Sequence, residues 1–167
     1  MMRSSLMTLI CLFLFGVFFV TPAASGEEPV PVSNRQDIKA VYEITKDEWE
    51  QGVGSGLYNI KAVIGLYKKM GIDPDQLDLH GVVHGDAGYF LLTDDAYNKE
   101  KKNGRGNPNT GIIRELTEAG ISLDLCSQTM KHNGWRAKDI LPEVTIVVDA
   151  YSRIVDLQEL DFSYIKF

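Results

Sequence analysis

Cysteine is scarce in this sequence, with two among 167 residues, Cys11 and Cys126. Cys11 lies inside an apolar N-terminal run, so the remainder of the chain holds one thiol. One thiol excludes an internal disulfide and every metal motif that needs paired cysteines. Any disulfide must therefore join two molecules, and packing has to stabilise the fold.

Long apolar runs are missing after the N-terminal region. Arg3 precedes the apolar run from Leu6 to Val20, and small residues follow it through Gly26, a pattern typical of a secretory signal peptide. The run is shorter than the roughly 20 residues that cross a bilayer comfortably, so an uncleaved membrane anchor is the less favoured alternative. We expect a periplasmic or secreted protein with a signal peptide at residues 1–25, a linker at 26–36 and one domain at 37–167. An unpaired thiol in an exported protein calls for a functional explanation.

Basic residues are in the minority. The chain has 17 Lys and Arg against 23 Asp and Glu, and loss of Arg3 with the signal leaves 16 against 23, a net charge of −7. Such an acidic protein is a poor partner for nucleic acid or for an anionic membrane surface. Roughly 140 residues remain after cleavage, which is enough for one domain with one sizeable core.

Several catalytic motifs are absent. The chain has no nucleophile elbow and no His-Glu-x-x-His helix, which argues against the common hydrolases and zinc peptidases. Gly52-Val-Gly-Ser-Gly56 precedes a predicted helix and invites a phosphate-loop interpretation. Its spacing is wrong for that motif and no Gly-Lys-Ser/Thr ending follows, so a flexible loop is favoured.

Apolar periodicity alternates between strand-like and helix-like segments along the domain. Strands are predicted at residues 38–44, 77–84, 121–126, 144–148 and 162–167, and helices at 56–70, 110–119, within 128–141 and at 152–160. The segment 144–148 is nearly all apolar, which predicts a buried strand. Strands separated by helices predict an α/β domain with three α/β/α layers and a mostly parallel sheet.

Two shorter segments complete the assignment. Asp86 is a candidate cap for a short helix that ends at Leu92. The polar stretch from Lys99 to Thr110 predicts a surface loop, with Thr110 as the N-cap of the following helix.

Cys126 and His84 each end a predicted strand. In open parallel sheets functional sites gather beyond the carboxyl ends of the strands, so the two side chains are expected to lie near each other. Cys126 also starts a helical segment, where backbone N–H groups favour a thiolate. The alternatives are a small buried thiol for Cys126 and an imidazole bound to loop backbone for His84.

The other histidines and the tryptophans are weaker candidates. His132 lies at a predicted helix end, where a cation is ordinary. His80 is four residues before His84 on one strand, roughly 13 Å away at strand rise, so the two cannot share a metal. A metal site of Cys126, His84 and His132 is a minor alternative. Core packing is the favoured role for Trp49 and Trp135.

Three stretches together resemble a known family. They are Val82-Val-His-Gly85, the run from Leu116 through Gly120 to Cys126, and Leu141-Pro-Glu-Val144 leading into a strand. With these motifs the chain from Ile38 to Phe167 resembles the DsrE/DsrF-like family. The resemblance implies an α/β/α domain with about five strands that assembles into trimers or hexamers. It also implies that Cys126 matches the cysteine on which sulfur-relay members carry a persulfide.

Two functions follow as hypotheses. The first is an exported sulfur carrier or sulfurtransferase that holds a persulfide on Cys126, assisted by His84, and that meets a sulfur donor and an acceptor thiol protein. The second is a non-enzymatic oligomeric binding module with a structural Cys126, in which the stretch from Lys99 to Thr110 contacts the ligand. We expect no cofactor and no metal in either case. The best-understood family members are cytoplasmic, so the pathway and the sulfur donor are not carried over to an exported chain.

Overall fold

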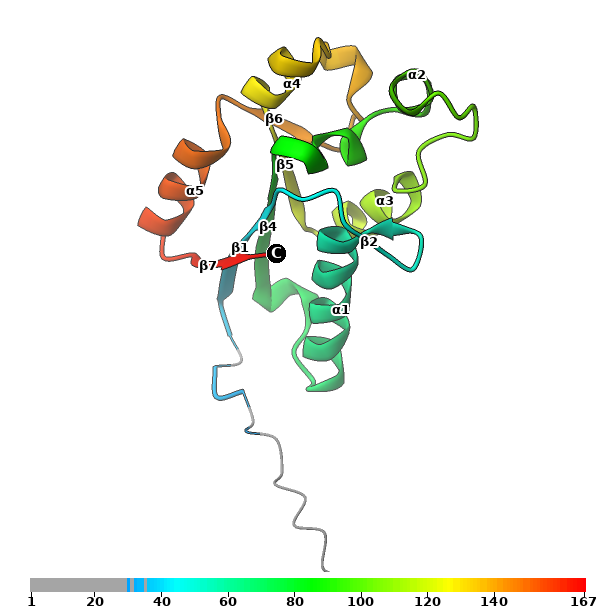
Figure 1. Cartoon of the computed structure of the whole chain (residues 1–167). Helices are drawn as coiled ribbons and strands as arrows, with labels where there is room; N and C mark the ends of the chain where they lie inside the picture. The colour runs from blue at the N-terminus through cyan, green and yellow to red at the C-terminus, as the bar shows by residue number, and fades with distance from the viewer. Residues whose placement is uncertain (1–29, 31, 35) are drawn as a thin grey trace, which may run out of the picture. The chain divides into compact units, whose positions relative to one another are not determined.

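The computed structural model describes residue 30, residues 32–34 and residues 36–167 (Figure 1). The predicted signal peptide at residues 1–25 lies outside these residues, as does most of the predicted linker. Residues Val32–Phe167 form one compact unit. In the described part of the chain, no helix is long and apolar enough to cross a membrane.

Five strands form one sheet in the order β6-β5-β4-β1-β7, and every neighbouring pair is parallel. β1 and β4 occupy inner positions and consist mostly of buried apolar residues, because helices cover both faces of an inner parallel strand. The prediction of a mostly parallel sheet is confirmed. The strands are β1 Ile38–Ile44, β4 Leu77–Val83, β5 Ser122–Cys126, β6 Thr145–Val147 and β7 Ser163–Lys166.

Helices pack on both faces of the sheet and confirm the three layers (Figure 1). α1 (Ser55–Lys69) and α3 (Thr110–Glu118) cover one face, over the larger apolar core. α5 (Ala150–Glu159) covers the other face, over a smaller core that contains Val41, Val82 and Cys126. Cys126 therefore lies on the α5 side of the sheet.

The remaining elements are short. β2 (Trp49–Glu50) and β3 (Val53–Gly54) form an antiparallel hairpin between β1 and α1. α2 and α4 lie beyond the carboxyl ends of the strands in Figure 1. Their bounds, with those of the 3-10 turns, are η1 Pro74–Gln76, η2 Gly85–Leu91, α2 Asp94–Lys101, α4 Ser127–Asn133 and η3 Ala137–Asp139.

The predicted surface loop from Lys99 to Thr110 was wrong in part. α2 extends through Lys101, and the polar residues Asn107 and Asn109 are buried. The Asn107 side-chain amide donates to the carbonyls of Phe90 and Leu92, and Asn109 Oδ1 accepts from Gly54 N–H at 2.6 Å. The buried amides hydrogen-bond with backbone groups of distant segments, a use that polarity alone does not reveal.

Three smaller predictions also need correction. The residues Gly52–Gly56 form the hairpin turn, β3 and the start of α1 rather than a flexible loop. Asp86 lies in the first turn of η2, where His84 holds the N-cap position, and Asn109 rather than Thr110 precedes α3. The N-cap position thus lies two residues before Asp86 and one residue before Thr110.

β6 is an edge strand, which corrects the prediction of a buried strand at 144–148. Ile146 is 40 % exposed and Val148 77 % exposed, because only β5 pairs with β6. An all-apolar run is typical of a central strand, but it is equally compatible with an apolar edge.

Candidate functional site

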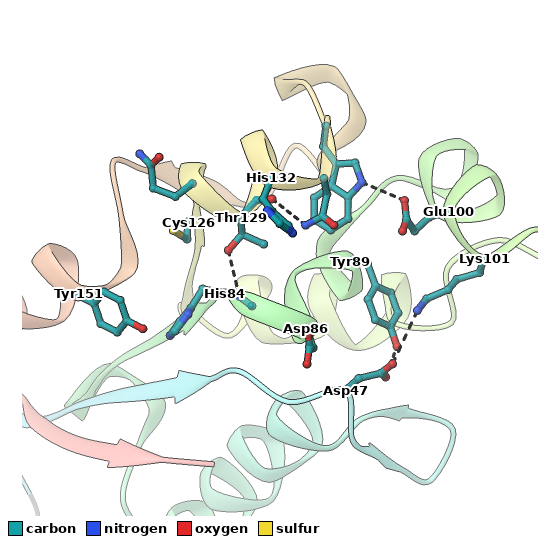
Figure 2. A pocket seen from close by; sticks show the side chains of 14 residues that line it. Asp47, His84, Asp86, Tyr89, Glu100, Lys101, Cys126, Thr129, His132 and Tyr151 are labelled. Atoms are coloured by element: carbon teal, nitrogen blue, oxygen red, sulfur yellow. Dashed lines mark hydrogen bonds and ion pairs between the residues drawn. The ribbon is translucent and has the colours of Figure 1, made fainter.

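A pocket of about 640 Å³ lies at the carboxyl edge of the sheet (Figure 2). After β5 the chain enters α4, which packs against η2, whereas after β6 it enters α5 on the opposite face. Neighbouring parallel strands whose connections diverge in this way leave a crevice beyond their ends. Cys126, His84 and His132 all contribute to the pocket wall, so the structure brings the three candidate residues together.

Cys126 is the last residue of β5 and occupies the N-cap position of α4. Its thiol is free, and the residue is only 5 % exposed. It belongs to the apolar core under α5 and also lines the pocket. Ser127 Oγ and the Gln128 side-chain amide donate to the carbonyl of Val148, at 2.7 and 3.2 Å, which fixes the start of α4 to the segment after β6.

His84 follows β4 directly and is held by side chains rather than by loop backbone. Its Nε2 lies 2.8 Å from Glu43 Oε1, and its ring meets the Tyr151 ring edge to face at 5.2 Å between centroids. In Figure 2 the imidazole is directed toward Tyr151. Among the described side chains, no hydrogen bond joins His84 to Cys126, so the two share a pocket without direct pairing.

Gly85 connects His84 to the next turn. Its φ of +60° lies in the left-handed region that favours glycine, and a Cβ here would approach the Thr45 carbonyl oxygen at 3.3 Å. Its N–H donates to Thr129 Oγ1 at 3.1 Å. This bond ties the turn after β4 to α4, and it thereby fixes the two sides of the pocket relative to each other.

The far side of the pocket is a polar aromatic cluster. The Tyr89 hydroxyl donates to Asp47, and the Lys101 ammonium lies 3.1 Å above the Tyr89 ring centroid and 3.9 Å from Asp47. Burial, followed by the hydrogen bond to Asp47, raises the pKa of Tyr89, so its hydroxyl remains a donor. The Trp135 indole N–H donates to Glu100 at 3.3 Å.

Carboxylates outnumber cations around this pocket. Asp47, Asp86 and Glu100 line it together with one lysine, Lys101, whose charge is already shared with Asp47. The lining is therefore acidic when the histidines are neutral.

The remaining histidine, His80, lies outside the pocket. It sits 3.5 Å from both Asp78 and Asp124 and meets the Phe162 ring edge to face. Asp124 is 1 % exposed and accepts from Arg153 Nε of α5 at 2.8 Å. The ion pair between Asp124 of β5 and Arg153 of α5 fastens α5 to the sheet.

A shared metal is not supported by the geometry. Within the range that the structure describes, no three His, Cys, Asp or Glu side chains are placed to hold a metal ion. Cys126, His84 and His132 line one pocket without forming such a group. The minor alternative of a metal on these three residues is therefore withdrawn.

Comparison with known proteins identifies the family. The family model described as "DsrE/DsrF-like family" matches residues 54–167. The chain belongs to the DsrE/DsrF-like family. No curated protein sequence matches the chain at a significant level.

Two solved structures share the fold of this DsrE/DsrF-like protein. A protein of unknown function, MTH1491 from Methanobacterium thermoautotrophicum, is 21 % identical, with a TM-score of 0.55 over 78 % of this chain and 100 % of its own. The ychN protein from E. coli is 18 % identical, with a TM-score of 0.55 over 78 % of this chain and 99 % of its own. At these identities the likeness concerns the fold alone.

Sequence reasoning missed several residues of this DsrE/DsrF-like site. Glu43 was overlooked within a strand, although a lone acid in the apolar stretch Ile38–Ile44 was a usable signal. Thr129 and Tyr151 have no distinguishing sequence pattern. They line the pocket because α4 and α5 begin near the carboxyl ends of the strands. Trp135, expected in the core, is partly buried there and also lines the pocket.

Proposed function

We propose that this DsrE/DsrF-like protein is an exported sulfur carrier that holds sulfane sulfur as a persulfide on Cys126. The observation that carries the proposal is the position of a free thiol in the wall of a pocket at the carboxyl edge of the sheet, beside a histidine. Family membership supports it, because the match includes the strand that ends in Cys126.

The chemistry needs one thiolate and no cofactor. The Cys126 thiolate attacks the terminal sulfur of a donor persulfide, R–S–S⁻, and forms a new S–S bond. The S–S bond of the donor breaks, and its electron pair leaves with R–S⁻, so one sulfur atom moves without net oxidation. An acceptor thiolate repeats the step on the loaded Cys126 and regenerates the free thiol.

His84 is the pocket's candidate for proton movement and charge stabilisation. Its imidazole lines the same pocket as Cys126, and imidazole is the side chain that most often serves as a general acid or base. It supports the transfer without being the sulfur-carrying group. Its loss is therefore expected to slow loading rather than to abolish it.

Sulfur loading tests this proposal. The purified domain is incubated with polysulfide, and bound sulfane sulfur is quantified as thiocyanate after cyanolysis, for wild type, Cys126→Ala and His84→Ala. We expect no loading in Cys126→Ala and roughly tenfold slower loading in His84→Ala. This is less than the roughly hundredfold effect that marks the low end for a general acid or base, because His84 only assists the transfer. Equal loading of wild type and Cys126→Ala would refute the carrier.

One observation favours the rival function, a binding module with a structural thiol. Cys126 is 5 % exposed and packs in the apolar core under α5. The two functions differ in thiol chemistry, so iodoacetamide labelling separates them. Labelling of the folded protein that is much faster than global unfolding supports the carrier, whereas labelling limited by unfolding supports the module.

The proposal includes export and assembly. The predicted signal peptide at residues 1–25 leads us to propose a periplasmic or secreted location, which cell fractionation with N-terminal sequencing of the mature protein tests. Family resemblance leads us to propose a trimer or hexamer, which light scattering after size-exclusion chromatography tests. The proposed partners are a sulfur donor and an acceptor thiol protein.

A further inference from the structure

We propose that Glu43 is the positioning residue of the pocket: its carboxylate orients the His84 imidazole and sets which ring nitrogen carries the proton. The effect of Glu43 on sulfur transfer rests on the proposed function of Cys126. Its effect on His84 does not, so the two parts can be tested separately.

Glu43 is an unexpected residue at its position. It belongs to the central strand β1 and is 4 % exposed. A buried carboxylate is costly unless other groups pair with it, and an apolar residue would fill a central strand equally well. A charge at this point therefore calls for a use beyond packing.

The two carboxylate oxygens of Glu43 have different partners. Oε2 accepts a hydrogen bond from the Tyr164 hydroxyl and lies 3.2 Å from Lys166 Nζ. Oε1 lies 2.8 Å from His84 Nε2. Lys166 offsets the negative charge and Tyr164 donates to the same oxygen, so Oε1 is left for the imidazole.

The last strand holds the carboxylate in place. In the parallel pairing of β1 with β7, Lys166 lies opposite Glu43 and Tyr164 lies one pleat earlier on the same face. The Phe167 N–H donates to the Glu43 carbonyl at 3.0 Å. The hydrogen bond to Glu43 raises the pKa of Tyr164 to about 12, so this hydroxyl stays protonated and keeps donating.

These contacts determine the state of the His84 ring. Burial alone would raise the pKa of Glu43, but hydrogen bonds from Tyr164, His84 and Lys166 outweigh it and hold that pKa below the usual carboxyl range. An ionised carboxylate is only an acceptor, so Nε2 carries a proton and Nδ1 is the free base of the neutral ring. The Tyr151 ring packs edge to face against the imidazole, with 5.2 Å between centroids, and limits its rotation.

The first test reads the imidazole directly. Long-range ¹H–¹⁵N NMR spectra of the full domain report the tautomer of each of its three histidines, and His84→Gln assigns the His84 signals. We expect the Nε2–H form of His84 in wild type and a mixture of tautomers in Glu43→Gln. Tyr164→Phe removes a hydrogen bond to Glu43, and Tyr164 itself is partly exposed. This variant should shift the tautomers of His84 in the same direction.

Asp124→Asn is the matched control. Asp124 is also a buried acid, on the same sheet face, but it contacts His80 and Arg153 rather than His84. It should leave the His84 tautomer unchanged. A His84 tautomer that is the same in wild type, Glu43→Gln and Tyr164→Phe would overturn the proposal, whatever the melting temperatures of the variants.

The second test reads sulfur loading below the melting temperature of every variant. Glu43→Gln should load polysulfide sulfur about tenfold more slowly than wild type, a typical effect of removing the partner that orients a functional imidazole. Asp124→Asn should load as wild type does. A changed tautomer with an unchanged loading rate would refute the link to Cys126. If Glu43→Gln changes the tautomer but wild type never loads sulfur, the sulfur carrier is refuted. The role of Glu43 in positioning His84 would then remain intact.

Discussion

Cys126 and Asp124 lie two residues apart on the same face of β5, yet they have different tasks. Cys126 lines the pocket, whereas Asp124 is sealed beneath α5 with Arg153 and His80. Burial would raise the pKa of Asp124, but hydrogen bonds from His80 and Arg153 prevail and lower it. Asp124 thus holds α5 next to the pocket without taking part in the chemistry of Cys126.

The lowered pKa of Asp124 predicts how stability depends on pH. A carboxyl whose pKa is lower in the folded state stabilises the protein above its unfolded pKa of about 3.9, and this contribution disappears as the pH falls through the folded pKa. We expect Asp124→Asn to lower the free energy of unfolding by about 3 kcal/mol near pH 7, because it breaks a buried ion pair.

Urea unfolding at a series of pH values measures this effect. The difference between wild type and Asp124→Asn should shrink as the pH falls from about 5 toward 2, while Glu43, whose pKa is also lowered, leaves some acid sensitivity in both proteins. A difference that is independent of pH would contradict the assigned role of the charge.

At the scale of elements, two buried asparagines join segments that are distant in sequence. Asn109 Oδ1 accepts from the backbone N–H of Gly54, and the Asn107 amide donates to the turn formed by η2. Gly54 cannot carry a larger residue, since a Cβ there would lie 2.6 Å from the Phe90 ring. The asparagines thereby fix the start of α1 to the start of α3.

Asn109→Ala should destabilise the domain by about 2 kcal/mol, because it leaves a buried backbone N–H without an acceptor. Asn103→Ala is the control from the same segment, since Asn103 is exposed and its side chain accepts from the nearby Arg105 N–H. Its cost should stay within about 0.5 kcal/mol. Thermal or urea unfolding measures both, and equal costs would show that the buried amide is not needed.

Local elements were predictable because periodicity is a property of consecutive residues. The apolar residues of β1 and the alternating apolar residues of β5 predicted strands, and Gly120 follows the helix predicted at residues 110–119. The Glu43 cluster could not be predicted in this way. Its contact with Tyr164 joins residues 121 positions apart and depends on β7 pairing with β1, which no local pattern reveals. The pocket residues Thr129 and Tyr151 depend likewise on the strand order.

At the scale of the whole molecule, negative charge dominates both the chain and its pocket. The formal net charge of the chain is −6. Within the pocket lining, the acidic residues Asp47, Asp86 and Glu100 face one lysine, Lys101. Charges within about one Debye length, roughly 8 Å at physiological salt, still act on an approaching ion. A cationic thiol reagent should therefore modify Cys126 faster than an anionic one.

Two methanethiosulfonates of opposite charge test this preference. After correction for their rates with free cysteine, the ammonium reagent should modify Cys126 about fivefold faster than the sulfonate reagent at low salt. Asp86→Asn and Glu100→Gln should reduce that ratio, and added salt should do the same. An equal or inverted ratio would mean that the pocket carboxylates do not control access.

The central claim is that Cys126 carries sulfane sulfur, and intact-mass spectrometry measures it most directly. The purified mature domain and Cys126→Ala are treated with polysulfide, and their masses are recorded before and after reduction. The account predicts a gain of one sulfur atom or more on wild type, reversed by reduction and missing from Cys126→Ala. An unmodified wild-type mass, obtained while the thiol is shown to be reduced, would contradict it and leave the binding module as the better description.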